Sequence, residues 1–236
     1  MTVRVVSLVP SATETLLSWD VVPAACTRFC EQPLLPHVGG TKDPDIQAIA
    51  ALRPDLVVMD REENRKEDAD ALAAMGVPLH VLHVTSLAAV PGELQTLAEA
   101  VDVSVPPVAL PAARASRGTA VAMIWRRPWM ALGADTYGAS VLRHVGLQPI
   151  AHHSEDRYPE VALDDVARRK PDVVVLPSEP YPFADRHRDE ITAAVPDANV
   201  VLVDGRDLVW WGSRSAAAVQ RLGSVMDGLR AARPPR

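Results

Sequence analysis

Cysteine, aromatic residues and long hydrophobic runs are all scarce in this sequence. It holds two cysteines and, among 236 residues, five Trp, three Tyr and two Phe. The apolar run at the N-terminus is broken by Arg4, Ser7 and Pro10 before it reaches the length of a signal peptide or a membrane span. We therefore expect no membrane insertion and a cytoplasmic location for the chain as written, or a periplasmic or extracellular one if a leader was removed.

Lysine is also scarce, and positive charge is not concentrated anywhere. Acidic residues outnumber basic ones by 30 to 24, which gives a net charge of −6, and the arginines are scattered among the acids. Binding to nucleic acid depends on clustered positive charge that displaces counterions. The composition therefore predicts no nucleic-acid partner.

Motifs of known metal and catalytic sites are missing. Cys26 and Cys30 have no second cysteine pair nearby, so we expect reduced, partly buried thiols rather than a zinc site. His80 and His83 fall in a predicted strand, where a spacing of three turns their rings to opposite faces. No nucleophile elbow, Walker loop or dinucleotide-binding glycine motif occurs. The sequence assigns no cofactor and no metal ligands.

One half of the sequence repeats the other at an offset of 117 residues. Residues 49–62 read IAALRPDLVVMDRE, and residues 166–179 read VARRKPDVVVLPSE. The Pro-Asp pair coincides together with the apolar positions on both of its sides. The same offset relates an opening strand near Val5 to one near Ala122. The sequence therefore predicts two similar lobes.

Each lobe alternates strands with helices. In the first lobe a capping box at Ser11–Glu14 predicts a helix start, and further helices are expected at 44–52 and 65–75. The predicted strands are 3–9, 21–26, 55–59, 79–84, 120–124, 173–176 and 200–203, and a last helix is predicted at 213–231.

This alternation predicts an α/β fold of two Rossmann-like lobes, each a mainly parallel sheet flanked by helices. We place the N-terminal lobe at 1–85 and the C-terminal lobe at 119–236. A single helical connection at 86–118, interrupted by prolines, joins them and leaves a cleft between them.

Polar and aromatic residues gather where loops follow the predicted strands. Glu62 and Glu179 are repeat equivalents just beyond two strand ends, and such ends face the ligand crevice in parallel sheets. Eight of the ten aromatic residues follow residue 124, mostly in loops. The expected polar contacts are Glu62, Glu63, Asn64, Arg126, Glu179 and Arg214; the expected aromatic platforms are Trp125, Trp129, Tyr158, Tyr181, Phe183 and Trp211.

Several segments resemble a known family. They are VSLVPSATE at 6–14, VGG at 38–40, ALRPDLV at 51–57 and YPEV at 158–161. They resemble the helical-backbone (class III) substrate-binding proteins of ABC importers, the group of the cobalamin-binding and iron-siderophore-binding proteins. The segments at 62–68, 124–129 and 179–183 are similar to a leaderless subgroup called helical backbone metal receptors.

The resemblance implies a small-molecule ligand such as a corrinoid, a metal chelate or a siderophore. In transport members a surface Glu on each lobe docks on the permease, and the matching positions here are Gln47 and Asp164. Because one carboxylate of this pair is missing, docking on an ABC permease is doubtful.

We therefore expect a ligand-binding protein of the importer type that is not an enzyme and works in the cytoplasm without a permease. One alternative is a cytosolic enzyme that uses Glu62 and Glu179 as general acid and base. Another is an interaction scaffold, which predicts that the aromatic side chains form one flat, exposed patch.

Overall fold

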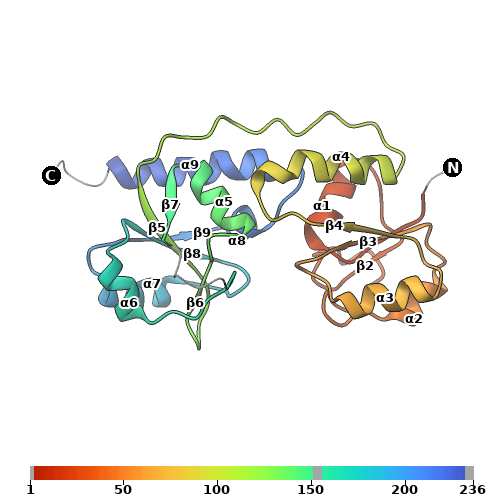
Figure 1. Cartoon of the computed structure of the whole chain (residues 1–236), viewed down its shortest axis with the longest axis horizontal. Helices are drawn as coiled ribbons and strands as arrows, with labels where there is room; N and C mark the ends of the chain where they lie inside the picture. Colours follow the sequence, from red (N-terminus) through yellow and green to blue (C-terminus); the bar gives the residue numbers. More distant parts are fainter. Residues whose placement is uncertain (1–2, 151–155, 232–236) are drawn as a thin grey trace. The chain divides into compact units, whose positions relative to one another are not determined.

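The chain folds as two α/β units, each built on its own parallel sheet (Figure 1). The computed structural model describes residues 3–150 and 156–231. The first unit contains residues 3–84, 88–109 and 211–213, and the second contains 85–87, 110–150, 156–210 and 214–231. The two similar units, each a mainly parallel sheet with helices, confirm the predicted fold class.

The sheet of the first unit has four parallel strands in the order β2-β1-β3-β4. Its central strands are completely buried, as expected for a sheet covered on both faces. The bounds are β1 (Val5–Ser7), β2 (Ala25–Cys26), β3 (Leu56–Asp60) and β4 (Leu79–Leu82).

Helices cover both faces of this sheet. Figure 1 shows α1 (Pro10–Ser18) and α4 (Val90–Ala100) on one face, with α2 (Ile46–Ala51) and α3 (Lys66–Ala74) on the other. A short 3-10 turn, η1 (Leu87–Ala89), precedes α4. We had assigned α4 to the connecting segment, but it belongs to the first unit because it packs beside β4 and buries Val90, Leu94 and Leu97.

The second unit repeats this sheet and adds a hairpin. Strands β7 (Leu147–Pro149), β5 (Gly118–Trp125), β8 (Val173–Pro177) and β9 (Asn199–Val203) pair in parallel, and β6 (Met130–Ala131) pairs antiparallel with the end of β5. In Figure 1, α5 and α9 lie on one face of the sheet, and α6 and α7 lie on the other. The helices are α5 (Tyr137–His144), α6 (Leu163–Arg169), α7 (Asp185–Ala194), α8 (Gly205–Val209) and α9 (Ser215–Ala231).

The internal repeat is visible in these bounds. Strand β8 covers the residues 117 positions after those of β3, and α6 begins 117 positions after α2. The strands before them differ in offset. Val6 pairs with Val57 and Val121 with Val174, so β1 and β5 are related by 115 positions. The two opening strands are therefore equivalent, as expected, but their offset is 115 residues and not 117.

Two predicted helix starts are also wrong. Helix α1 begins at Pro10 after Val9, which forms no side-chain cap, so Ser11 and Glu14 lie inside the helix and form no capping box. Proline favours the first helical position because its φ is already helical. In the second case the helix expected from Pro44 begins at Ile46, because the Asp45 carboxylate accepts a hydrogen bond from Ala48 N (2.9 Å) and caps the helix there.

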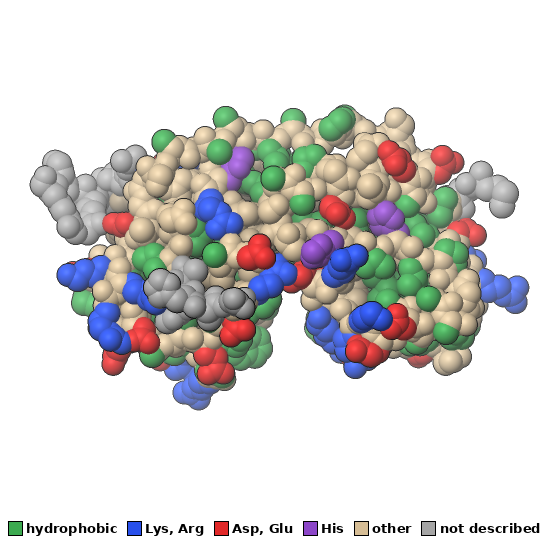
Figure 2. All heavy atoms as spheres, in the orientation of Figure 1, with side chains coloured by type: hydrophobic (Ala, Val, Ile, Leu, Met, Phe, Trp, Pro, Cys, Tyr) green, Lys and Arg blue, Asp and Glu red, His purple; other side chains and the backbone are tan. Residues whose placement is uncertain are grey.

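The described surface mixes charges and apolar groups. On the face drawn in Figure 2, acidic and basic side chains lie interspersed over both units. Among the described residues, no helix has both the length and the hydrophobicity required to cross a membrane.

Candidate functional site

The carboxyl ends of β3 and β8 carry the two equivalent acidic loops. Strand β3 ends at Asp60 and β8 ends at Pro177, so Glu62 and Glu179 each follow their strand by two residues. Loops at this edge of a parallel sheet are the usual position for ligand contacts.

A buried carboxylate fixes the loop after β3. Asp60 is 1% exposed, and its oxygens accept hydrogen bonds from the backbone N–H groups of Glu62 (2.8 Å) and Val84 (3.4 Å). Burial raises the pKa of Asp60 above its usual value, although these hydrogen bonds act in the opposite direction. Asp60 therefore positions the loop.

Asn64 fastens the same loop to two other segments. Its side-chain oxygen accepts a hydrogen bond from Asp60 N (2.9 Å), and its Nδ2 donates to Leu8 O (3.2 Å) and Thr41 O (3.0 Å). The side chain is buried and its amide is engaged on both ends. Its observed role is to hold the loop, and the ligand contact expected of it stays a prediction.

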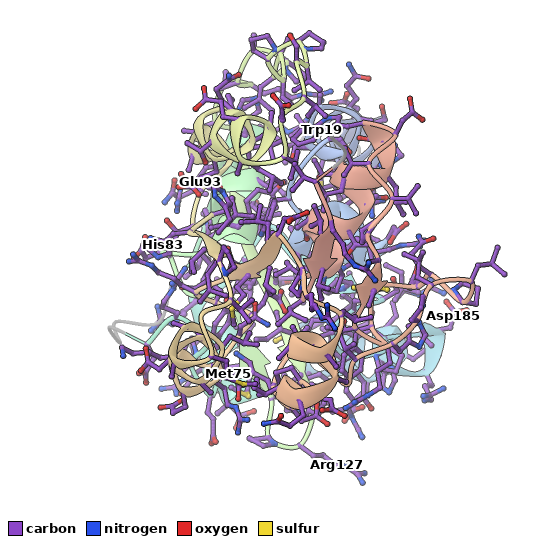
Figure 3. The ribbon with its side chains drawn as sticks, turned by 90° about the vertical axis from the view of Figure 1, so that its right-hand side faces the viewer. Trp19, Met75, His83, Glu93, Arg127 and Asp185 are labelled. Atoms are coloured by element: carbon purple, nitrogen blue, oxygen red, sulfur yellow. The ribbon has the colours of Figure 1, made fainter. Side chains whose placement is uncertain are left out.

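Glu62 and Glu63 are the half-buried acids of this edge. A carboxylate oxygen of Glu62 lies 3.8 Å from Nε2 of His83, and Lys42 Nζ donates to the Glu62 carbonyl at 2.8 Å. His83 lies beside Glu93, whose Oε2 accepts from His83 N at 3.0 Å (Figure 3). The edge therefore combines carboxylates with two basic side chains, of which we had singled out only the carboxylates.

Phe29 is a further candidate that we missed. It lies in the loop after β2, its side chain is 50% exposed, and the Arg28 guanidinium lies 4.8 Å from the ring centre. Arg28 is held by two hydrogen bonds of 2.9 Å to Asp43. The signal was present in the sequence, because Phe29 is one of only two aromatic residues in the first half and lies three residues after the predicted strand 21–26.

In the second unit the structure brings four of the predicted platforms together. Trp129 and Phe183 stack with ring centres 6.0 Å apart, Phe183 meets Tyr181 at 4.8 Å, and Trp125 meets Tyr181 edge-on at 5.5 Å. Phe183 is buried in the core at 6% exposure, whereas Trp125 is 42% exposed. The aromatic cluster (Trp125, Trp129, Tyr181 and Phe183) thus runs from the core to the surface and does not form the flat, exposed patch expected of a scaffold.

A buried histidine supports the aromatic cluster. His187 is 3% exposed, its Nδ1 accepts from Ala184 N at the start of α7 (3.0 Å), and its Nε2 lies 3.4 Å from the Tyr181 hydroxyl. Burial lowers the pKa of His187, and the positive charges of Arg186 and Arg126 lower it further. The ring is therefore neutral at pH 7 and acts as an acceptor.

The two arginines of the β5–β6 hairpin differ in their partners. Arg126 forms two hydrogen bonds of 3.0 Å with Glu190 and lies 5.6 Å from the Trp129 ring centre. Arg127 lies at the exposed tip, and its φ of +73° is in the left-handed region (Figure 3). Arg126 is thus committed to an ion pair, while Arg127 projects into solvent.

Glu179 is anchored by an indole. Its Oε2 accepts a hydrogen bond of 3.0 Å from Trp210 Nε1. The first residue of α8, Gly205, approaches the Glu179 backbone so closely that a Cβ there would clash with it, and Gly205 N donates to Ser178 Oγ (2.9 Å). The start of α8 and the loop after β8 therefore form one tightly packed edge.

The remaining three candidates differ in their exposure and in their contacts. Tyr158 is 42% exposed, in a segment that pairs with the hairpin through Ala131 N to Pro159 O (3.0 Å). Trp211 is buried at 4% exposure and belongs to the first unit. Arg214 lies 3.3 Å from the buried Asp207 carboxylate. Ligand contacts by these residues stay predictions.

No metal centre is evident in the described part of the chain. Within residues 3–150 and 156–231, no group of three or more His, Cys, Asp or Glu side chains is arranged to hold a metal ion. Cys26 and Cys30 are both free and buried, and the expectation that they are reduced in solution stays a prediction.

Comparisons with known proteins agree on one class. The vitamin B12-binding proteins of Yersinia pestis (strain Pestoides F) and Yersinia pseudotuberculosis (strain IP 31758) are each 26% identical over 192 residues, covering 73% of this chain and 69% of the relative.

Solved structures share the fold. The periplasmic vitamin B12 binding protein BtuF of Vibrio cholerae has a TM-score of 0.77 and 18% identity, with 97% of this chain and 98% of that chain covered. A periplasmic heme binding protein from Pseudomonas aeruginosa has a TM-score of 0.77 and 18% identity, with 95% and 92% covered.

These relatives are all named as binding proteins, which confirms the prediction that the chain is not an enzyme. The family model described as periplasmic binding protein matches residues 5–194, which is most of the sequence. The chain therefore belongs to the periplasmic binding protein family, as its motifs predicted.

Proposed function

We propose that the chain binds a small organic ligand with a flat, conjugated body, of the corrinoid, haem or metal-chelate type. The observation that carries the proposal is the aromatic cluster at the carboxyl edge of the second sheet. There Trp125 is exposed while Phe183 is locked in the core, so the exposed ring rests on a rigid base. Rigid aromatic surfaces bind apolar faces with little loss of side-chain entropy.

Polar side chains that follow the strand ends are suited to contact the polar side groups of such a ligand. In the second unit, Arg127 offers an exposed guanidinium between Trp125 and Trp129 in the sequence; the first unit separately carries the half-buried Glu62 and Glu63. The relatives support this ligand class, since their names specify vitamin B12 and heme. Both molecules are macrocycles with apolar faces and polar side groups.

A transporter partner is less well supported by these residues. Gln47 and Asp164 are exposed at equivalent positions on α2 and α6, 117 residues apart. Only Asp164 carries a charge for a permease arginine. The absence of permease docking and the cytoplasmic location therefore stay predictions.

A thermal-shift panel of cyanocobalamin, ferric haem, a ferric siderophore and divalent metal ions tests the proposal. A ligand at a hundred times its Kd stabilises the folded state by about 2.7 kcal/mol, which corresponds to a rise in Tm of roughly 5 to 10 °C for a chain of this size. We expect such a rise with at least one of the macrocycles or chelates. A cooperative unfolding transition that none of the compounds shifts would contradict the proposal.

A further inference from the structure

The two cysteines lie at the base of the loop that presents Phe29. Cys26 is the last residue of β2, and Cys30 lies in the loop that follows. Their side chains are 0% and 2% exposed, and both thiols are free. Because the chain has only these two cysteines, any thiol chemistry of the protein takes place here.

A tight turn lies between the two cysteines. Cys30 N donates to Thr27 O at 3.1 Å, which closes a turn over residues 27–30 with Arg28 and Phe29 at its tip. Cys26 is fixed at the other end, because its N–H donates to Pro36 O (2.9 Å) and its carbonyl accepts from Val38 N (2.9 Å). The two side chains interact, since Cys30 is one of the groups that raise the pKa of Cys26.

Two threonine hydroxyls complete the surroundings of this pair. The Oγ1 atoms of Thr13 and Thr27 each lie 3.2 Å from the Cys30 sulfur, and both threonines are completely buried. Burial, followed by the nearby Cys30, raises the pKa of Cys26 to about 12, so Cys26 is a neutral thiol in the closed structure. The pair is thus packed as a unit, with no metal-ligating third residue among the described side chains.

We propose that Cys26 and Cys30 form a reversible disulfide within the chain when the protein meets a small-molecule disulfide, and that this bond stiffens the turn that carries Phe29. A disulfide requires Cβ atoms about 3.8 Å apart, and the turn over residues 27–30 leads the chain back toward the end of β2, where Cys26 lies. The inference does not depend on the identity of any ligand.

The thiol–disulfide exchange takes place in two steps. Opening of residues 27–36 exposes Cys30 first, since Cys26 is held in the sheet by β1. The Cys30 thiol loses its proton to water, and its thiolate attacks one sulfur of R–S–S–R, so that a Cys30–S–S–R bond forms and one R–S⁻ leaves and is protonated. Cys26 then loses its proton and attacks the Cys30 sulfur, which forms the Cys26–Cys30 bond and releases the second R–S⁻. Two protein thiols are oxidised and one disulfide is reduced to two thiols.

The first test is intact-mass analysis of the folded protein before and after incubation with oxidised glutathione. We expect the loss of two hydrogens with no glutathione added, and reversal by dithiothreitol. Iodoacetamide added in denaturant should label two cysteines before oxidation and none after it. Two labelled cysteines after oxidation, a stable glutathione adduct on each cysteine, or a crosslink between two chains would each overturn the proposal.

Variants that lack one cysteine test which residues form the bond, and amide hydrogen exchange tests whether the turn becomes stiffer. Cys26→Ser and Cys30→Ser should each lose the two-hydrogen product, which assigns it to the pair. Hydrogen exchange of the amides of residues 28–31 should slow about tenfold on oxidation of the wild type and stay unchanged in either variant under the same treatment. If the disulfide forms but these amides exchange at the same rate, the proposed stiffening of the turn is wrong.

Discussion

The ring planes of Trp129 and Phe183 are 2° from parallel, which joins the β5–β6 hairpin to the loop before α7. Phe183 belongs to the buried core, and Trp129 packs against that core from its edge. The stack therefore transfers the rigidity of the sheet to the hairpin that carries Trp125. Several consequences can be measured.

Replacing Phe183 should remove the base of the aromatic cluster. Phe183→Ala deletes a buried ring and should lower the free energy of unfolding by about 3 to 5 kcal/mol, measured by urea denaturation. Phe183→Leu keeps most of the apolar volume and serves as the control, with a loss of roughly 1.5 kcal/mol. Equal, small effects of both substitutions would show that the ring does not support the cluster.

Substitutions of Asn64 and Glu62 distinguish a side chain that holds the loop in place from one that lies at its surface. Asn64→Ala removes three hydrogen bonds of a buried amide and should cost about 2 to 4 kcal/mol of unfolding free energy. Glu62→Gln changes a half-buried surface side chain and should cost less than about 0.5 kcal/mol. Chemical denaturation of both variants is the measurement, and the reverse ranking would contradict the assigned roles.

His187 should make stability depend on pH. Its folded pKa lies below the unfolded value of about 6.5, because of burial and the charges of Arg186 and Arg126, with Glu190 acting in the opposite direction. The unfolded chain therefore takes up the proton first as the pH falls. Stability from the neutral ring is fully present above the unfolded pKa and is lost as the pH falls from there toward the lower folded pKa.

His187→Gln is the variant that isolates this effect. Glutamine at the third position of α7 can still accept the hydrogen bond from Ala184 N, as in a capping box, but it does not titrate. Unfolding free energies measured from pH 7.5 to pH 5 should fall less steeply in the variant than in the wild type. Parallel curves would show that His187 does not bind its proton more weakly in the folded protein.

Arg127 is expected to strain its hairpin. Left-handed backbone is unfavourable for residues other than glycine by about 1 to 2 kcal/mol, so Arg127→Gly should raise the unfolding free energy by about 0.5 to 1 kcal/mol once the flexibility of glycine is included. Arg126→Gly, in the same hairpin, loses the ion pair with Glu190 and should destabilise by about 1 kcal/mol or more. Thermal unfolding of the two variants should therefore shift in opposite directions.

The repeat made much of the fold predictable from sequence. Strands β3 and β8 and helices α2 and α6 follow the Pro-Asp anchors, where apolar runs and helix patterns are local and strong. The start of α1 was missed because a proline at the first helical position fixed it one residue before the expected serine cap. Local signals of similar strength competed there, and only the structure decides between them.

Side-chain roles were less predictable because they depend on contacts between distant residues. Asn64 reads as one polar residue in an acidic loop, yet its amide binds a carbonyl 56 positions away, at Leu8. Phe183 reads as a loop aromatic, yet the packing of β8 and α7 encloses it. The sequence placed these residues at the correct edge, but their burial follows from the assembled sheet.

The most direct test of the account is calorimetric titration of the wild type and of Trp125→Ala with cyanocobalamin and, separately, with ferric haem. Trp125 is 42% exposed, so the substitution should leave the unfolding transition nearly unchanged. The account predicts that the wild type binds at least one of the two compounds and that the variant binds it at least tenfold more weakly. Equal affinity in both proteins, or no binding of either compound by a folded wild type, would contradict it.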